Sequence, residues 1–327
     1  FAIDRGHANC LKLILEAGGD AGAVDARSNP AIVTAAGKGF LDCVQLLIDF
    51  KADVSACTDF AQQTALHSSA SGGYTEICKI LLKGGASVDF QNRNGFSALH
   101  LAAQAGFPDC VDLMISEGAD FKLANDGGST ALHLAAQWSG NSTDKYLQII
   151  QKLLDSGVDV NAKDRSDNSA LGIVARSGSA AGAKLLIEMG GAVNYAGQNG
   201  LQYPILDLAG KGHTECLKPL LDAKADINVK GVAGMTAIMH ASLKDRTPFL
   251  RGLIAANADI NATSDDGSTA LHFAADAGSH QCLKVLLAAG VSPTCQNQAG
   301  ETPLQRAEAK ARYDCMENLQ NALGMDE

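Results

Sequence analysis

The sequence is poor in aromatic residues and lacks long apolar segments. Aromatic residues make up 5% of the 327 residues, and Trp138 is the single tryptophan. No segment approaches the roughly 18 consecutive apolar residues that a membrane-spanning helix needs, so we expect no direct membrane insertion. The net charge of -10, without a cluster of lysine and arginine, argues against nucleic acid or anionic lipid as the main partner.

Motifs of catalysis and metal binding are also missing. The nine cysteines form no C-x-x-C pair, and no paired Cys/His spacing suits a zinc site. There is neither a G-x-S-x-G nucleophile segment nor a glycine-rich phosphate loop after a strand. The sequence therefore predicts no catalytic residue, no cofactor and no metal.

What the sequence does contain is a repeated eight-residue segment. Thr130–Gln137 reads Thr-Ala-Leu-His-Leu-Ala-Ala-Gln, close copies begin at Ser97 and Thr269, and a looser copy begins at Thr64. The first residue can cap a helix by accepting from a backbone N–H, and His133 can return a ring nitrogen to that capping residue. A leucine and two alanines on one face then allow another helix to approach closely.

The position of the first residue of this segment recurs at intervals of 33 to 39 residues. A period in this range indicates a repeat architecture. Each repeat is expected to contain a turn, a short helix, a glycine loop and a longer apolar helix. The recurring positions are Pro30, Thr64, Ser97, Thr130, Ser169, Tyr203, Thr236, Thr269 and Thr302.

This pattern resembles the ankyrin repeat along the whole chain. The resemblance implies an all-α solenoid of stacked helix-loop-helix units joined by β-hairpin-like turns, in one domain over residues 1–327. We number ten repeats from the N-terminus. Their expected bounds are 1–25 (partial), 26–59, 60–92, 93–125, 126–164, 165–198, 199–231, 232–264, 265–297 and 298–327.

Several repeats depart from the pattern. The first keeps only its second half, so we expect the natural protein to continue upstream or this chain to be a fragment. The fifth carries a polar insertion near 139–145, which predicts a loop. Repeats six to eight place Gly172, Leu206 and Met239 where others have histidine, so we expect their capping pair to be lost and these repeats to be less regular. The polar tenth repeat is expected to be a C-terminal cap.

Recurrence also interprets the cysteines and histidines. The motif histidines lie one repeat apart, roughly 10 Å, which is too far to share a metal. Six cysteines lie four residues after the central glycine or its replacement, a place that favours a small buried hydrophobe between stacked helices. Reduced thiols are typical of a cytoplasmic or nuclear protein. The six are Cys10, Cys43, Cys110, Cys216, Cys282 and Cys315.

The resemblance implies that a partner protein binds the concave face, formed by the hairpin tips and the outer positions of the first helices. Trp138, with Arg176 and Phe96, is the preferred centre, since Trp and Arg are enriched at interface hot spots. The alternatives are that Trp138 packs under the insertion loop and that Phe60 and Phe96 join neighbouring tips. The expected partner-binding residues are Phe60, Phe96, Gln104, Gln137, Trp138, Arg165, Arg176, Tyr195, Lys211 and Lys244.

Three asparagines, Asn161, Asn228 and Asn261, each follow Asp-Val or Asp-Ile, with a leucine eight residues earlier. This spacing is similar to the pattern that the asparaginyl hydroxylase of the hypoxia pathway accepts in ankyrin repeats, which makes them candidate hydroxylation sites. The alternative, which their recurrence favours, is that each asparagine hydrogen-bonds across its own hairpin turn.

Together these features predict a non-catalytic scaffold that binds another protein. One alternative is a targeting or regulatory segment of a larger enzyme or membrane protein. Another is a structural component of a large assembly. A small-molecule site is disfavoured, because open concave faces lack the enclosed apolar pocket that such ligands usually occupy.

Overall fold

The computed structural model describes residues 2–138, 144–195 and 203–324. The chain divides into two compact units, an N-terminal unit of Phe1–Ala170 and a C-terminal unit of Leu171–Glu327. The predicted all-α fold is confirmed: the described residues form helices, and β structure among them is limited to isolated bridges such as Cys57 with Thr64. None of the described helices is both long and apolar enough to cross a membrane.

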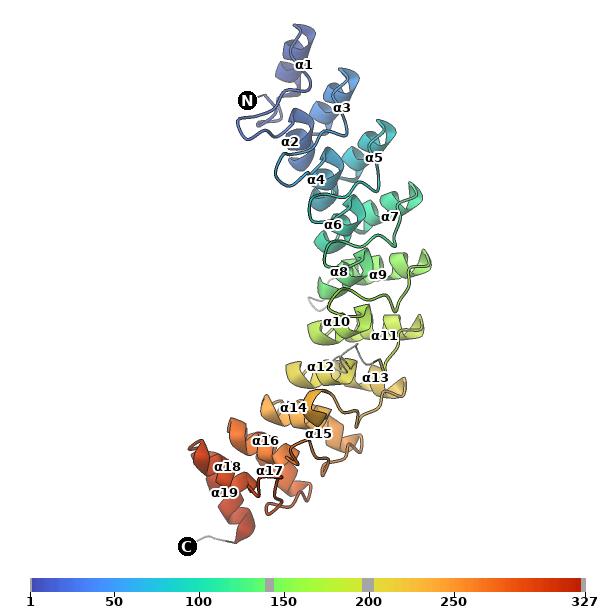
Figure 1. Cartoon of the computed structure of the whole chain (residues 1–327). Coiled ribbons are helices and arrows are strands. Elements are labelled where there is room, and N and C mark those ends of the chain that lie inside the picture. Colours follow the sequence, from blue (N-terminus) through green and yellow to red (C-terminus); the bar gives the residue numbers. More distant parts are fainter. Residues whose placement is uncertain (1, 139–143, 196–202, 325–327) are drawn as a thin grey trace. The chain divides into compact units, whose positions relative to one another are not determined.

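The N-terminal unit consists of helix pairs. The first helices of repeats two to five (α2, α4, α6 and α8) pack side by side, and the second helices (α1, α3, α5, α7 and α9) form a second layer beside them (Figure 1). Their bounds are α1 Ala8–Glu16, α2 Ala31–Gly37, α3 Leu41–Asp49, α4 Ala65–Gly72, α5 Thr75–Lys83, α6 Ala98–Ala105, α7 Pro108–Ser116, α8 Ala131–Trp138 and α9 Asp144–Asp155.

The second helix of the fifth repeat begins earlier than the sequence indicated. Helix α9 begins at Asp144, so Asp144 and Lys145 are helical rather than part of the loop. An acidic residue at a helix N-terminus interacts favourably with the helix dipole, which explains this earlier start. Residues 139–143 lie outside the described residues.

The C-terminal unit has the same two-layer plan within itself. Its first helices α12, α14, α16 and α18 pack in sequence, and so do its second helices α15, α17 and α19. The helix bounds are α10 Ala170–Ser177, α11 Ala180–Glu188, α12 Pro204–Lys211, α13 Leu217–Asp222, α14 Ala237–Leu243, α15 Thr247–Ala255, α16 Ala270–Ala277, α17 His280–Ala288, α18 Pro303–Ala309 and α19 Tyr313–Leu323.

The expected irregularity is visible in repeats seven and eight. In repeat seven the second helix starts as a 3-10 turn, Thr214–Cys216 (η2), and α13 is only six residues long. In the turn before α14, a second 3-10 turn, Val232–Gly234 (η3), holds Ala233 at φ +55°. Asp245 also has a positive φ, +53°, at the loop position that glycine occupies in regular repeats. Residues other than glycine are strained at positive φ, which makes these turns less favourable.

Small and branched residues of the repeat form the core. The leucine of the first helix is buried in successive repeats, at Leu66, Leu99 and Leu132, and the second helices bury Leu81 and Met114. Burying each such side chain contributes about 1.5–3 kcal/mol. The repeated segment therefore explains why each helix packs on its neighbours.

Three of the four motif histidines also contact the next repeat, whereas the buried Nε2 of His100 has no hydrogen-bond partner among the described residues. Nδ1 of His133 accepts from the backbone N–H of Thr130 at 3.2 Å, as the sequence predicted. Because Nδ1 accepts, the proton lies on Nε2, which is 3.0 Å from the carbonyl of Ala162 in the next repeat. His67 with Phe96 and His272 with Glu301 make the same contact, both at 2.9 Å. The histidine thus joins two repeats.

The predicted loss of the capping pair is only partly correct for repeat eight. The backbone N–H of Thr236 donates to Sδ of Met239 at 3.4 Å, so a capping contact persists there. A thioether is a weak acceptor and has no donor to offer the next repeat. In repeat seven, Tyr203 makes no side-chain cap bond, as expected.

The loop glycines let one repeat cover the previous one. A Cβ at Gly73, whose φ is +73°, would overlap the ring of Phe107 from the next repeat. Tyr146 covers Gly106 in the same way, and its hydroxyl donates to the carbonyl of Gln104 at 3.2 Å. The Tyr146 hydroxyl thereby gives a partner to a carbonyl group at the C-terminal end of α6, which the helix itself leaves without one.

The cysteine prediction holds for five of the six recurring positions. Cys43, Cys110, Cys216, Cys282 and Cys315 are buried, and all nine cysteines of the chain are free. The sulfurs of Cys282 and Cys315 lie 3.8 and 3.9 Å from carbonyls 41 residues earlier. The prediction is wrong for Cys10, which is exposed, because no residue of this chain stands 41 positions before it.

Candidate protein-binding surface

The exposed side of the first helices, here called the first-helix face, is uncharged in the N-terminal unit. Helices α4, α6 and α8 contain no aspartate, glutamate, lysine or arginine. On this face Gln104 is half-buried, whereas Gln137 and Trp138 are exposed, Trp138 to 41%. An exposed tryptophan beside amides provides both apolar contact area and hydrogen-bonding groups. The insertion loop proposed to cover Trp138 lies outside the described residues.

At the hairpin tips, Phe60 is held by the neighbouring tip although it is 83% exposed. The guanidinium of Arg93 lies 5.3 Å from the centre of the Phe60 ring, and Nη2 of Arg93 donates to the carbonyl of Asp59 at 3.3 Å. The proposed link between tips is therefore present at Phe60. Arg93 is not among the expected partner-binding residues. It follows Phe60 by 33 residues, the length of one repeat, and this spacing could have indicated the contact.

Phe96 and Arg165 occupy different environments. Phe96 is half-buried and meets the His100 ring edge-on, with centroids 6.1 Å apart. Its carbonyl accepts from His67, so this residue contributes to the contact between repeats. Arg165 is exposed at its tip, where its backbone N–H donates to the carbonyl of Gly127 at 2.9 Å.

In the C-terminal unit the first-helix face carries charge. Arg176 on α10 forms an ion pair of 3.0 Å with Asp207 on α12. Burial raises the pKa of Asp207, and the charge of Arg176 partly offsets this effect. Sequence reasoning found Arg176 and missed Asp207, which is half-buried on α12.

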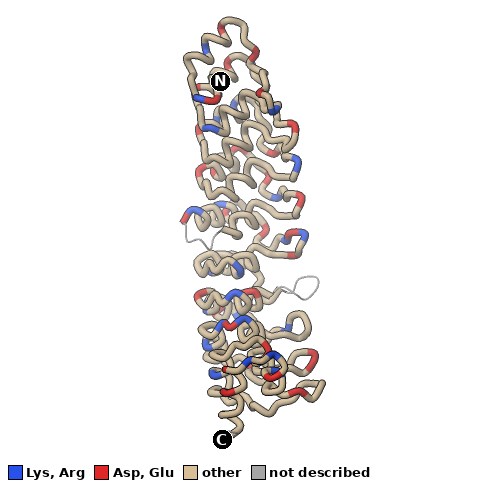
Figure 2. The backbone as a smooth tube through the Cα atoms, turned by 90° about the vertical axis from the view of Figure 1, so that its left-hand side faces the viewer, with Lys and Arg blue, Asp and Glu red and all other residues tan. Residues whose placement is uncertain are grey.

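Lys211, at the end of α12, and Lys244, just after α14, are both exposed. His240 on α14 is half-buried, and its pKa is lowered by burial and by the charge of Lys244. Tyr195 is half-buried in the turn that precedes residues 196–202, which lie outside the described residues. Acidic and basic residues are otherwise interspersed along each unit (Figure 2).

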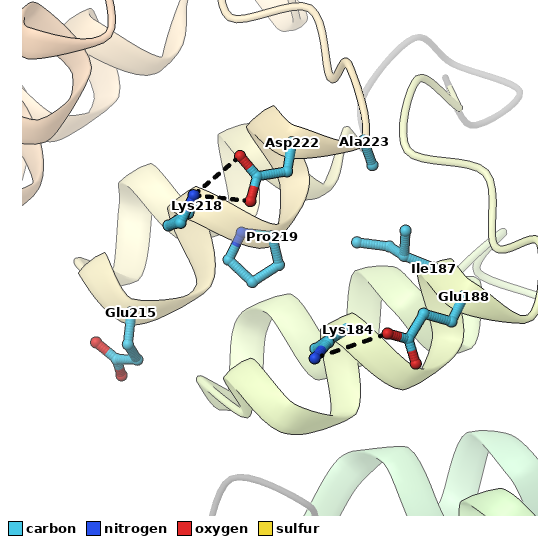
Figure 3. A pocket seen from close by; sticks show the side chains of 8 residues that line it. All are labelled: Lys184, Ile187, Glu188, Glu215, Lys218, Pro219, Asp222 and Ala223. Atoms are coloured by element: carbon cyan, nitrogen blue, oxygen red, sulfur yellow. Dashed lines mark hydrogen bonds and ion pairs between the residues drawn. The ribbon is translucent and has the colours of Figure 1, made fainter.

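On the second helices of this unit, a groove of about 490 Å³ lies between α11 and α13. Its floor includes Ile187 and Pro219 (Figure 3). Four of the charged residues that line it are paired within their helices: Lys184 with Glu188 at 3.7 Å and Lys218 with Asp222 at 2.9 Å, while Glu215 lies 3.8 Å from His213. The groove therefore offers apolar surface with paired charge along its rim.

The described residues contain no group of three or more His, Cys, Asp or Glu side chains arranged to hold a metal ion. Among the histidines, burial lowers the pKa of His67, His133 and His272, and that of His100 to about 4. These rings are therefore neutral near pH 7, as the acceptor role of Nδ1 in each cap requires.

The three candidate hydroxylation sites are exposed. Asn228 does not bond across its own hairpin: its side-chain oxygen accepts from the backbone N–H of Asp259 in the next repeat at 2.8 Å. Within its own turn, Asn228 donates only its backbone N–H, to Asp226. Hydroxylation of Asn161, Asn228 and Asn261 stays a prediction.

Comparisons with known proteins agree with this architecture. The family model for ankyrin repeats matches residues 1–92, 73–164, 142–231, 171–264 and 238–326. A probable E3 ubiquitin-protein ligase of rice (Oryza sativa subsp. japonica), XBOS33, is 41% identical over 68 residues. These residues make up 20% of this chain and 13% of that relative, so the similarity covers only a small part of its length.

Proposed function

The chain belongs to the ankyrin-repeat family, and on this premise we propose that it is a non-catalytic scaffold that binds a partner protein along its first-helix face and hairpin tips. Ankyrin repeats are protein–protein interaction modules, so membership itself implies a protein partner. We further propose the cytoplasm or nucleus as its location, which the free and mostly buried thiols support.

The observation that carries this proposal is the exposure of Trp138. Tryptophan is usually well buried, and it is among the residues that dominate binding energy at interfaces. Here 41% of it is exposed at the end of α8, beside the exposed Gln137 and on helices without charge. A partner that binds there would cover this surface without removing water from a charged side chain of α8.

Affinity capture with identification of the bound protein tests the proposal. The variants are Trp138→Ala and Met189→Ala, because Met189 is also 41% exposed but follows α11, a second helix. Both must keep the helical signal and melting temperature of the original chain. We expect a captured partner to be lost with Trp138→Ala and retained with Met189→Ala. Equal retention by both would count against this face.

The second candidate is a targeting or regulatory segment of a larger enzyme or membrane protein. The rice relative named as a probable E3 ubiquitin-protein ligase favours this candidate, because the residues similar to this chain make up only 13% of its length. In this arrangement the repeats would still bind a partner, and the activity would belong to another domain. Sequencing the natural transcript would test it, since a catalytic or membrane domain must then adjoin these repeats.

A further inference from the structure

Two lysines of the C-terminal unit stand at the same place in consecutive repeats. Lys211 follows the recurring position at Tyr203 by eight residues, and Lys244 follows Thr236 by the same number. Both are exposed, and neither has an acidic group within 4 Å among the described residues. Because α12 and α14 pack against each other, the two positions are separated by roughly 10 Å, the usual helix packing distance.

In repeat two, the lysine at this same position binds an acidic residue of the protein itself. Lys38, eight residues after Pro30, forms an ion pair of 2.8 Å with Asp4 of the preceding repeat. The residue 34 positions before Lys211 is Ser177, and Lys211 itself stands 33 positions before Lys244. Lys211 and Lys244 therefore lack the acid that this position pairs with in repeat two.

The surroundings of the two lysines leave positive charge in excess. Arg246 lies over Gly212 and donates from Nε to the carbonyl of Gly210 at 3.4 Å, which holds a third cation beside Lys211. Two acids lie near these cations. Asp207 is paired with Arg176 and also interacts with the charge of Lys211, and Asp245 stands between Lys244 and Arg246 in the sequence. The four cations Arg176, Lys211, Lys244 and Arg246 therefore outnumber these two acids.

The two nearby histidines carry no negative charge, and one of them lies beside Glu215. His240 is half-buried, and burial together with Lys244 favours its neutral form. His213 lies 3.8 Å from Glu215 and also contacts the carbonyl of Arg176 at 3.1 Å. A positive row on a chain whose net charge is -10 is a local exception.

We propose that the row formed by Lys211, Lys244 and Arg246 binds an acidic segment of the partner protein. This inference rests on the proposed function and specifies the chemistry of the partner. A row of cations about 10 Å apart attracts a segment with repeated carboxylates, and such pairing sets specificity and association rate more than affinity.

The rival explanation is local. Lys211 ends α12 and Lys244 is the C-cap of α14, where a cation interacts favourably with the helix dipole. This role predicts a change in stability and none in binding. The two explanations are therefore separated by a binding measurement on variants of equal charge.

The probe is a fluorescein-labelled peptide of alternating glutamate and alanine, with a glutamine-for-glutamate peptide as its neutral partner. Fluorescence anisotropy would compare Lys211→Ala/Lys244→Ala with Lys184→Ala/Lys218→Ala, which removes two lysines that are already paired on the second helices. We expect the first double variant to lose about tenfold in affinity and the second less than about twofold, with binding that weakens as salt rises.

Failure of the original chain to bind the acidic peptide, equal losses in both double variants, or equal binding of the neutral peptide would each overturn the inference. Its failure is distinguishable from that of the proposed function. A partner that depends on Trp138 but ignores Lys211 and Lys244 contradicts this inference alone, whereas loss of the proposed function leaves no captured partner dependent on Trp138.

Discussion

Nε2 of His272 lies 2.9 Å from the carbonyl oxygen of Glu301, a residue 29 positions later in the next repeat. Since Nδ1 of the same ring accepts from the backbone N–H of Thr269 at 3.1 Å, one side chain closes a helix cap and joins two repeats. Repeat proteins depend on contacts between neighbours for stability. This pair of bonds therefore helps to hold the ninth and tenth repeats together.

Replacing His272 should destabilise the protein. His272→Ala removes both bonds and leaves a buried N–H and a carbonyl without their partner, which we expect to cost about 1–3 kcal/mol in the free energy of unfolding. Urea denaturation would measure this value. His7→Ala is the control, because His7 is exposed and makes no cap bond. A His272→Ala variant as stable as the control would contradict the role given to this ring.

Stability should decrease in mild acid. The pKa of the buried motif histidines is lowered, to about 4 for His100, against about 6.5 in an unfolded chain. The unfolded state therefore binds more protons below pH 6.5, so the stabilisation is complete above that pH and is lost as pH falls toward about 4. Urea midpoints measured from pH 7.5 to pH 4.5 would record this slope.

Glutamine offers a control that does not titrate. In the tenth repeat, Oε1 of Gln305 accepts from the backbone N–H of Thr302 at 2.8 Å, so glutamine can replace the capping function of histidine. His100→Gln should therefore reduce the pH slope of the urea midpoint. An unchanged slope would mean that other groups cause the acid sensitivity.

Restoring the motif in repeat eight should stabilise it. In Met239→His, Nδ1 can accept from Thr236 in place of the weak thioether, and Nε2 would face the carbonyl of Ser268, 29 residues on. We expect a gain of about 1 kcal/mol, the usual net value of one hydrogen bond. Thermal unfolding, with Met239→Leu as a control of apolar character, would measure it. A lower melting temperature for Met239→His than for Met239→Leu would refute this expectation.

Alanine substitutions at two loop glycines distinguish the effect of backbone strain from that of packing. Gly73 and Gly118 have similar φ values, +73° and +82°, but only a Cβ at Gly73 would overlap a neighbour, the ring of Phe107. Gly118→Ala should cost about 1 kcal/mol from the left-handed backbone alone. Gly73→Ala should cost more, because Phe107 must also move. Equal losses in urea denaturation would show that Phe107 adjusts freely.

The local pattern of the repeat was predictable, because capping and helix packing depend on residues three or four apart. The Thr130 and His133 pair is an example. The bond from His133 to Ala162 was not predicted, since it requires the register between consecutive repeats. The same holds for the 31-residue separation of Arg176 and Asp207, which converts a proposed contact residue into half of a partly buried ion pair.

The exposure of Cys10 shows a second limit of predicting burial from a repeat pattern. Its position in the repeat is the one that is buried elsewhere, yet burial depends on the first helix of a preceding repeat. The pattern identifies equivalent residues, and their environment depends on which neighbours are present. Met239 shows the converse, because an apolar residue retained a weak capping contact through its sulfur.

The central claim is that a partner protein covers the first-helix face, and the single tryptophan allows a direct measurement. Replacing Trp138 with 5-fluorotryptophan gives the chain one ¹⁹F resonance, from a side chain that is 41% exposed. Titration with the captured partner, with complex formation followed by sedimentation, should shift this resonance as the indole leaves water. An unchanged resonance at full complex formation would contradict the claim and place the partner elsewhere.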